Sequence, residues 1–121
     1  MTQNSRAKIT GNAALGSNFG ARLKKDTWME KSISTFGFTD VELNLSHRTK
    51  NYEGGDELVI EYWNGSTWKT VHATNEAQWH NRNYEIGADG HNNSNFKIRL
   101  RTTALEARER SDIDNVELTG R

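Results

Sequence analysis

Two stretches of the chain alternate strictly between apolar and polar residues. One begins at Val41 and the other at Phe96, and their apolar members are Val41, Leu43, Leu45, Phe96, Ile98 and Leu100. Side chains along a strand point alternately to its two faces, so both stretches predict strands with one buried face and one polar face. A core built from such strands leaves an ordered polar surface on the other side, which suits binding.

Glycines and Asn-Gly pairs divide the rest of the chain into segments of strand length. The predicted strands are 6–10, 19–24, 27–34, 40–49, 56–63, 66–73, 80–86, 96–103 and 111–119. Eight or nine short strands without intervening helices favour an all-β fold, an antiparallel β-sandwich of the jelly-roll type. Residues 103–110 have helical propensity but are too few for a stable helix, so we interpret them as a charged loop.

The composition limits the architecture and the partners. A chain of 121 residues suits one domain, in which we take 1–14 as an N-terminal segment with the first short strand and 15–121 as the sandwich. Sixteen basic and sixteen acidic residues cancel, so no net field attracts nucleic acid or an anionic membrane. The absence of cysteine excludes disulfides and thiolate chemistry. We expect a monomer.

No segment suggests a membrane span or a leader. None approaches the roughly 18 apolar residues of a membrane helix. The polar start, Met1 to Ser5, also lacks the apolar run of a signal peptide.

The pair Asn64-Gly65 predicts a hairpin whose loop length decides which residues face each other. A two-residue turn places Trp68 opposite Glu61 on the polar face. A three-residue loop with Gly65 in the left-handed region turns Trp68 to the core side, where Ile60 and Tyr62 also point, and we favour this register. Glu61 then faces the surface, where it would pair with Arg48 of the preceding strand.

The last predicted strand changes phase. Its apolar residues pass from Ile113 to Val116 and Leu118, so one extra residue forms a bulge between Asp114 and Asn115. A bulge with Asp112 and Asp114 is one way to present oxygen ligands to a hard cation. The alternative is that these carboxylates cap backbone amides.

The order of these motifs resembles a known group of domains. It is similar to the jelly-roll accessory domains of bacterial secreted hydrolases, related in plan to MAM-type domains and to carbohydrate-binding modules. The resemblance rests on Ser32–Thr35, Phe38–Leu43, Arg48-Thr49, Gly55–Tyr62, Gly65–Trp68, Trp79, Phe96–Arg101 and Asp112–Val116. It implies a non-catalytic, extracellular module tethered to the catalytic domain of a larger secreted protein.

The same resemblance implies a cofactor. In several carbohydrate-binding families an Asp of a closing Asp-x-Val segment helps to hold a structural calcium ion, and Asp114 occupies that position. Asp112 is the second candidate ligand. Further ligands would come from the N-terminal loops, where Asn12 and Asp26 are the candidates.

Exposed aromatic rings would decide whether such a module binds sugar, because glycans stack on rigid rings. Trp28 and Trp63 have the opposite parity to their apolar neighbours, so we expect both at the surface, joined by Tyr52 of a Gly-rich loop. The alternative is that these rings only stabilise cross-strand pairs. The resemblance implies that Trp68 and Trp79 are core residues, and their replacement by Ala is then expected to cost about 3–5 kcal/mol.

A basic stripe accompanies the aromatic residues. Lys97, Arg99 and Arg101 project to one side of a strand, with Arg48 on the same predicted sheet. They would hold the carboxylates or sulfates of an acidic polysaccharide. The alternative is a solvated charge lattice neutralised by Glu42 and Glu61.

Catalytic patterns are missing from the sequence. The four histidines are dispersed without the HExxH spacing, and neither a Gly-x-Ser-x-Gly elbow nor a phosphate-binding glycine loop is present. Asp112 and Asp114 are adjacent on one strand, not opposed across a substrate as glycoside hydrolysis requires. We therefore predict a binding module for a polysaccharide or glycan, not an enzyme. The alternative is a protein-interaction or spacer domain of an adhesin or secreted protease that binds no glycan.

Overall fold

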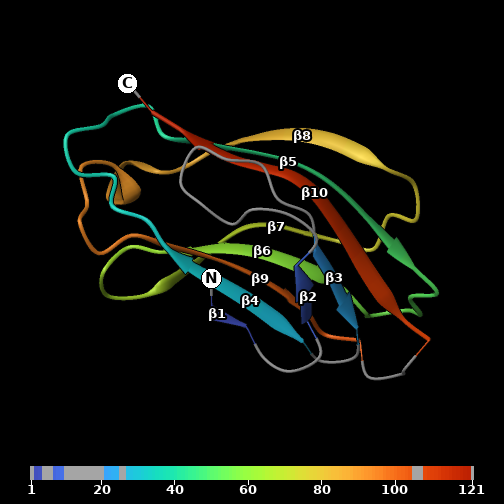
Figure 1. The fold of residues 1–121 in the computed structure, drawn as a ribbon. Helices are drawn as coiled ribbons and strands as arrows, with labels where there is room; N and C mark the ends of the chain where they lie inside the picture. Colours follow the sequence, from blue (N-terminus) through green and yellow to red (C-terminus); the bar gives the residue numbers. More distant parts are fainter. Residues whose placement is uncertain (1, 4–6, 10–20, 25–26, 105–107, 121) are drawn as a thin grey trace.

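Two antiparallel sheets stacked face to face make up the described part of the chain (Figure 1). The computed structural model describes residues 2–3, 7–9, 21–24, 27–104 and 108–120. Sheet A has the strand order β1 (Thr2–Gln3), β4 (Trp28–Ser32), β9 (Lys97–Thr102), β6 (Leu58–Trp63) and β7 (Trp68–Thr74). Sheet B has the order β2 (Ala7–Ile9), β3 (Ala21–Lys24), β10 (Arg110–Thr119), β5 (Glu42–Lys50) and β8 (His80–Glu85).

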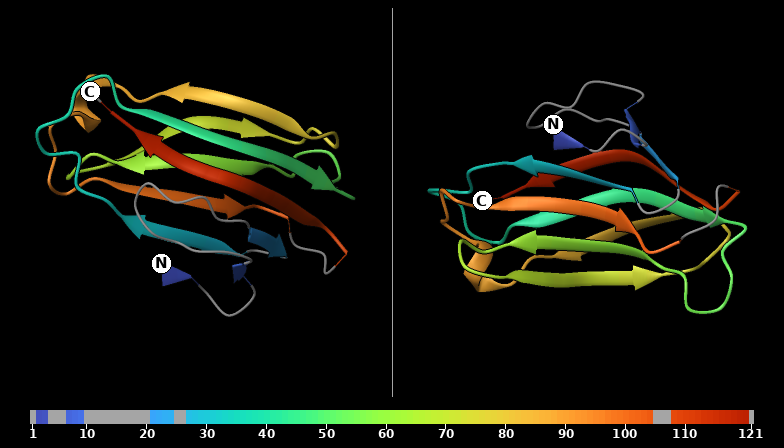
Figure 2. Two further views of the ribbon diagram at one scale, coloured as in Figure 1. Left: turned by 45° about the horizontal axis from the view of Figure 1, so that its top comes forward. Right: turned by 90° about the horizontal axis from the view of Figure 1, so that it is seen from below.

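The chain crosses repeatedly between the two sheets. From β4 onward it passes to β5 in sheet B, to β6 and β7 in sheet A, to β8 in sheet B, to β9 in sheet A and to β10 in sheet B. Apart from the pairs β6–β7 and β2–β3, neighbouring strands within a sheet are therefore not consecutive in sequence, as in a jelly roll. The predicted antiparallel sandwich of the jelly-roll type is confirmed, and both sheets appear in the two views of Figure 2.

The alternating stretches form the centre of the core. In β5 and β9 every second side chain is buried, and these residues meet between the sheets. The buried apolar cluster consists of Leu23, Met29, Ile33, Val41, Leu43, Leu45, Leu58, Ile60, Tyr62, Ile86, Phe96, Ile98, Leu100, Ile113 and Val116. The period of two in the sequence thus becomes one dry interior and two polar outer faces.

Nine predicted strands correspond to β2 to β10, with ends that differ by a few residues. The two-residue strand β1 was not predicted. In the described residues the one helical element is the short 3₁₀ turn Ala88–Gly90. The described part of 103–110 contains no helix before β10 begins at Arg110, while 105–107 and the expected boundary at residue 14 lie outside the described residues.

The predicted bulge in β10 is present. The register of β10 against β5 shifts between Asp114 and Glu117, and Asn115 has a φ of 53°. One extra residue on β10 returns Val116 to the core after Ile113, because the bulge reverses the parity of the strand.

The predicted register of the β6–β7 hairpin is wrong. Trp68 lies opposite Trp63, with four loop residues between them, so both indoles point out of sheet A. The Asn64 side chain accepts hydrogen bonds from the backbone N–H groups of Ser66 and Thr67, which stabilises the longer loop. Gly65 does have the expected positive φ, at 100°.

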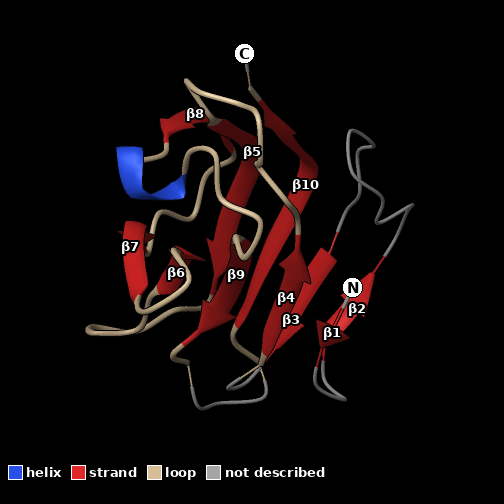
Figure 3. Ribbon diagram, turned by 90° about the vertical axis from the view of Figure 1, so that its left-hand side faces the viewer, coloured by secondary structure: helices blue, strands red, loops and turns tan. Residues whose placement is uncertain are grey.

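The edge strands β7 and β8 lie on the same side of the sandwich (Figure 3). A cluster of histidines lies between them, with members from β5, β7 and β8. His47 of β5 is fully buried, and its ring centroid lies 6.1 Å from that of His72 and 6.3 Å from that of His80. The His47 Nε2 atom is 2.8 Å from the Tyr84 hydroxyl, whereas its Nδ1 has no hydrogen-bond partner among the described residues. Burial, with His72 and His80 close by, lowers the pKa of His47 to about 4. We call His47, His72 and His80, together with Tyr84, the histidine seam.

Candidate functional site

The outer face of sheet A gathers three tryptophans around a charged centre, and we call it the indole face. Strand register places its residues in three rows across the four long strands of the sheet. The rows are Trp28, Arg101, Val59 and Ala73; then Glu30, Arg99, Glu61 and Thr70; then Ser32, Lys97, Trp63 and Trp68. Residues from four separate stretches of sequence meet here because the jelly roll makes distant strands neighbours (Figure 2).

Trp63 and Trp68 form the aromatic corner of this face. Their ring centroids lie 5.4 Å apart and their planes meet at 55°. The Arg99 guanidinium lies over the Trp68 ring, 3.9 Å from its centroid. Both indoles are partly exposed, so their position is fixed by each other and by Arg99 while part of each ring remains open to a ligand.

Glu61 forms the centre of the indole face. Its side chain is only 4% exposed, and the Nε atoms of both Arg99 and Arg101 donate to its Oε1, the latter over 2.9 Å. Beside this group Lys97 lies 3.7 Å from Glu30. The buried carboxylate therefore holds two guanidinium groups in place on the surface above it.

Trp28 stands at the opposite corner of the face. It lies across from Arg101 in the register and lines, with Glu30, Arg99 and Arg101, a shallow depression of about 380 Å³. A ring beside two arginines provides both an apolar surface and hydrogen-bond donors for a polar ligand. Trp28 and Trp63 thus share one face, as the sequence indicated, although they occupy separate corners.

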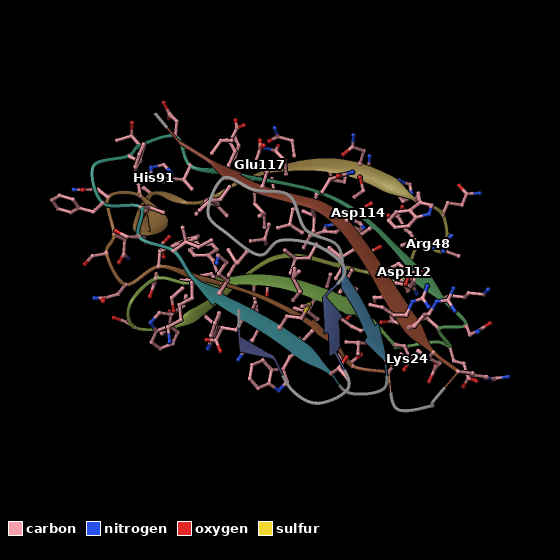
Figure 4. All side chains as sticks on the ribbon, in the orientation of Figure 1. Lys24, Arg48, His91, Asp112, Asp114 and Glu117 are labelled. Carbon is pink, nitrogen blue, oxygen red and sulfur yellow. The ribbon has the colours of Figure 1, made fainter. Side chains whose placement is uncertain are left out.

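Arg48 lies on the other side of the sandwich, so the predicted pair with Glu61 is wrong. Strand β5 belongs to sheet B, and Arg48 donates to Asp112 over 2.9 Å. Figure 4 shows the two side chains next to each other on the outer face of sheet B. Glu42 also belongs to sheet B, where it accepts a hydrogen bond from Asn83, so it does not neutralise the stripe on β9.

Tyr52 does not join the two tryptophans. Its hydroxyl hydrogen-bonds to Thr102 and Ser111, two buried residues of facing strands in the two sheets. Burial raises the pKa of the Tyr52 hydroxyl. The Tyr52 hydroxyl therefore links the two sheets at one end of the core, so it is not available to a ligand on the outer face of sheet A.

Trp68 and Trp79 are not core residues, and that prediction is wrong. Trp68 belongs to the indole face, and Trp79 is 47% exposed beneath the Arg48 guanidinium, 4.8 Å from its centroid. Trp68 is thus a site residue that the sequence reasoning missed. The signal was the run Asn64-Gly65-Ser66-Thr67, which as a four-residue loop gives Trp68 the same outward direction as Trp63.

The residues around the bulge do not form a cation site by themselves. Asp112 is surrounded by arginines, with Arg22 at 2.8 Å, Arg48 at 2.9 Å and Arg110 at 3.4 Å. Burial opposes ionisation of Asp112, but hydrogen bonds from Arg22 and Arg48 outweigh it and lower the pKa of the carboxyl. A carboxylate neutralised in this way is a poor ligand for a further cation.

Asp114 is exposed, and its Oδ1 accepts the backbone N–H of Asn115 over 2.8 Å, which is a capping contact. Within the described ranges no group of three or more His, Asp or Glu is placed to hold a metal ion. Asn12 and Asp26 lie outside the described residues. The calcium site therefore stays a prediction, to which the described residues contribute Asp114 alone.

In the described residues no helix has the length and apolarity that crossing a membrane requires. A comparison with protein-family models finds no match, and a comparison with curated proteins finds none either.

Similar solved structures are carbohydrate-binding modules. A structure named Family 16 Carbohydrate Binding Module-2 has a TM-score of 0.65 and 16% identity, with 94% of this chain and 85% of that chain covered. The CBM22-1 xylan-binding domain from Paenibacillus barcinonensis Xyn10C has a TM-score of 0.57 and 12% identity, with 98% and 84% covered. TmCBM61 in complex with β-1,4-galactotriose has a TM-score of 0.56 and 12% identity, with 99% and 86% covered. The chain is a jelly-roll domain with the fold of carbohydrate-binding modules.

Proposed function

We propose that the protein binds glycan chains on the indole face. The observation that carries this proposal is the gathering of Trp28, Trp63 and Trp68 on one outer sheet face, next to charged hydrogen-bonding groups. Sugar rings combine an apolar face with a rim of hydroxyls, so they match partly exposed indoles beside arginines and carboxylates. Solved structures of the same fold include a xylan-binding domain and a module in complex with a galactotriose.

The tilt between the indoles indicates the form of the ligand. Trp63 and Trp68 meet at 55°, so their rings do not make the coplanar row that would lie flat on a crystalline polymer. Two rings in contact at this angle form a ridged surface, which suits one flexible chain better than a flat array of chains. We therefore expect single, soluble or loosely packed polysaccharide chains as ligands.

The proposed context is that of a non-catalytic module in a larger secreted protein. Its role would be to raise the local concentration of a tethered catalytic domain on a polysaccharide, which increases occupancy without any new contact to the reacting bond. The fold supports this context, since similar structures are carbohydrate-binding modules.

Calcium is the proposed structural ion, held through Asp114 and residues outside the described ranges. A chelator should then lower the melting temperature, and Asp114→Asn should remove that dependence, because binding to the folded state alone stabilises it. Asp112→Asn should leave the dependence unchanged, since arginines already hold that carboxylate. An unmutated protein that melts at the same temperature with calcium and with chelator would end this proposal.

One observation favours the alternative of a protein-interaction domain. Phe36 and Phe38, in the loop between β4 and β5, are 71% and 47% exposed, and Phe38 borders a groove of about 150 Å³ lined mainly by apolar residues of the sheet ends. Exposed apolar patches mark interaction sites more often than chance. A domain that bound no polysaccharide, with or without calcium, would leave this alternative as the better account.

A depletion assay with immobilised polymers tests glycan binding. The unmutated protein is mixed with galactan, xylan and polygalacturonate coupled to beads and with amorphous cellulose, and the fraction left in solution is measured. We expect retention by at least one polymer and a loss of about tenfold in affinity for Trp63→Ala, since one lost ring contact costs on the order of 1 kcal/mol. Trp79→Ala removes an indole from the opposite side and should bind as before. Equal losses for the two variants would contradict the assignment of the face.

A further inference from the structure

The charges that a ligand meets on the indole face are mostly positive. Strand β9 presents Lys97, Arg99 and Arg101 along the middle of the face, and their side chains are 40%, 26% and 40% exposed. The acidic partners are less accessible, because Glu61 is 4% and Glu30 21% exposed. The accessible surface therefore carries more positive than negative charge, although the whole chain is neutral.

Both arginines keep donors free of described partners. Each donates through Nε to the same oxygen of Glu61, and no described residue accepts from their terminal nitrogens. A guanidinium held by Nε keeps a planar pair of N–H groups directed away from its partner, which suits an incoming carboxylate or sulfate. Glu61 thus positions two preformed anion-binding groups and reduces the entropy that a ligand would otherwise lose in ordering them.

Arginines held through Nε also occur on the opposite face of the sandwich, so they do not by themselves identify a site. There Arg22 and Arg48 donate to the carboxylate of Asp112, Arg110 lies 3.4 Å from it, and Arg48 also covers Trp79. Among the described residues Trp79 is the one indole beside those arginines, whereas the indole face places three indoles in the rows of Arg101 and Lys97. A sugar ring that carried an anionic group would find a stacking surface and a cation together there.

We propose that the indole face prefers anionic glycans, in which a uronate carboxylate or a sulfate pairs with Arg99 and Arg101 while the sugar ring contacts a neighbouring indole. This preference rests on the proposed glycan binding and adds the substrate class. A nucleic acid offers the same negative charge, but a face that also holds Glu30 and Glu61 attracts a dense polyphosphate less than a chain with spaced charges.

Isothermal titration with four probes tests the preference. The first is a galacturonate oligosaccharide, and the second is its carboxyl-reduced form, matched in length and linkage. The third is a sulfated galactose oligosaccharide, and the fourth is a single-stranded oligonucleotide. We expect binding of the galacturonate probe at least about tenfold tighter than that of its reduced form. The sulfated probe distinguishes a general preference for anions from one for carboxylates.

Arg101→Gln is the informative variant, because Arg99 still pairs with Glu61 and keeps that buried carboxylate neutralised. It should weaken binding of the galacturonate probe about tenfold and that of the reduced probe little. Arg101→Lys should recover part of the loss by restoring the charge. Arg48→Gln, on the other face, is the matched control and should bind like the unmutated protein. Raising the salt concentration should weaken binding of the galacturonate probe and leave binding of its carboxyl-reduced form unchanged.

The outcomes separate the two proposals. If the galacturonate probe and its carboxyl-reduced form bind equally, and Arg101→Gln affects the two equally, glycan binding stands and the anionic preference is wrong. If the oligonucleotide binds as tightly as the galacturonate probe, the site is a general polyanion surface and the preference is also wrong. If neither the depletion assay nor titration detects any glycan, the proposed function itself fails.

Discussion

Each outer face of the sandwich pairs a nearly buried carboxylate with arginines, but the two faces differ in the aromatic side chains that they expose. On sheet A, Glu61 lies under Arg99 and Arg101; on sheet B, Asp112 lies among Arg22, Arg48 and Arg110. In both places a nearly buried carboxylate accepts hydrogen bonds from arginines of neighbouring strands. The faces differ in their aromatic residues, since three indoles accompany Glu61 whereas Asp112 has only Trp79 near it, at a strand end.

This difference separates a structural role from a binding role. Arginine–carboxylate clusters recur on both faces, so a stripe of arginines does not by itself identify a site. On sheet B, Arg22 and Arg48 donate through Nε to Asp112, Arg110 lies 3.4 Å from it, and one indole, Trp79, lies under Arg48. On sheet A, Arg99 and Arg101 donate through Nε to one oxygen of Glu61, and three partly exposed indoles lie in the rows around them. The number of indoles, not the pairing of the arginines, distinguishes the indole face.

The largest expected effect comes from removing the cations of each cluster. Arg99→Met with Arg101→Met leaves Glu61 buried without an arginine, which should lower the free energy of unfolding by about 3–5 kcal/mol. Arg22→Met with Arg48→Met leaves Arg110 at 3.4 Å from Asp112, so the loss should be smaller, about 2 kcal/mol. Urea unfolding of both double variants measures the difference. Equal losses would show that the two clusters are energetically alike.

As the pH falls, protonation of His47 in the histidine seam should destabilise the fold first, and protonation of Asp112 on sheet B should do so only at lower pH. The pKa of His47 is lowered to about 4 in the folded state, so the unfolded chain binds the proton more tightly. The His47 contribution is fully present above its unfolded pKa and is lost as the pH falls from about 6.5 to about 4, by about 3 kcal/mol. The pKa of Asp112 is lowered too, so its contribution is lost only below about pH 4.

The control for acid unfolding is His47→Gln, which cannot take up the proton. Its stability should change much less than that of the unmutated protein between about pH 7 and about pH 4. If both proteins lose stability in parallel over this range, another group causes the loss, and the histidine seam does not explain it.

The smallest effects concern the two tryptophans assigned to the core from sequence. Trp68 contacts Trp63 and Arg99 at the surface, so Trp68→Ala should cost about 1–2 kcal/mol. Trp79 contacts Arg48 and is 47% exposed, so Trp79→Ala should cost less than about 1 kcal/mol. Thermal unfolding of both variants gives these values. A loss of about 3–5 kcal/mol in either variant would restore the core assignment.

The sequence predicted what depends on neighbouring residues. The alternation in β5 and β9 and the phase change from Ile113 to Val116 are local signals, so the strands, the core and the bulge were predicted correctly. Sheet membership depends on pairing between distant strands. Arg48 and Glu61 belong to consecutive strands, yet the chain crosses to the other sheet between them.

The candidate site was predicted in part for the same reason. Trp28, Trp63 and the stripe on β9 follow from parity within single strands. Predicting the direction of Trp68 required the length of the loop that begins at Asn64. A change of one residue in that length reverses the direction of every side chain in β7. The partner of Arg48 required a pairing with β10, 64 residues further along the chain.

The central claim, that the indole face binds glycan, is tested most directly by the four indole N–H signals in a nitrogen–proton correlation spectrum. The unmutated protein is titrated with a β-1,4-galacto-oligosaccharide and with a galacturonate oligosaccharide, and the signals are assigned by single Trp→Phe variants. We predict that the signals of Trp63, Trp68 and Trp28 shift on saturation with at least one probe while that of Trp79 remains in place. A shift of Trp79 alone, or four unchanged signals with both probes, would contradict the account.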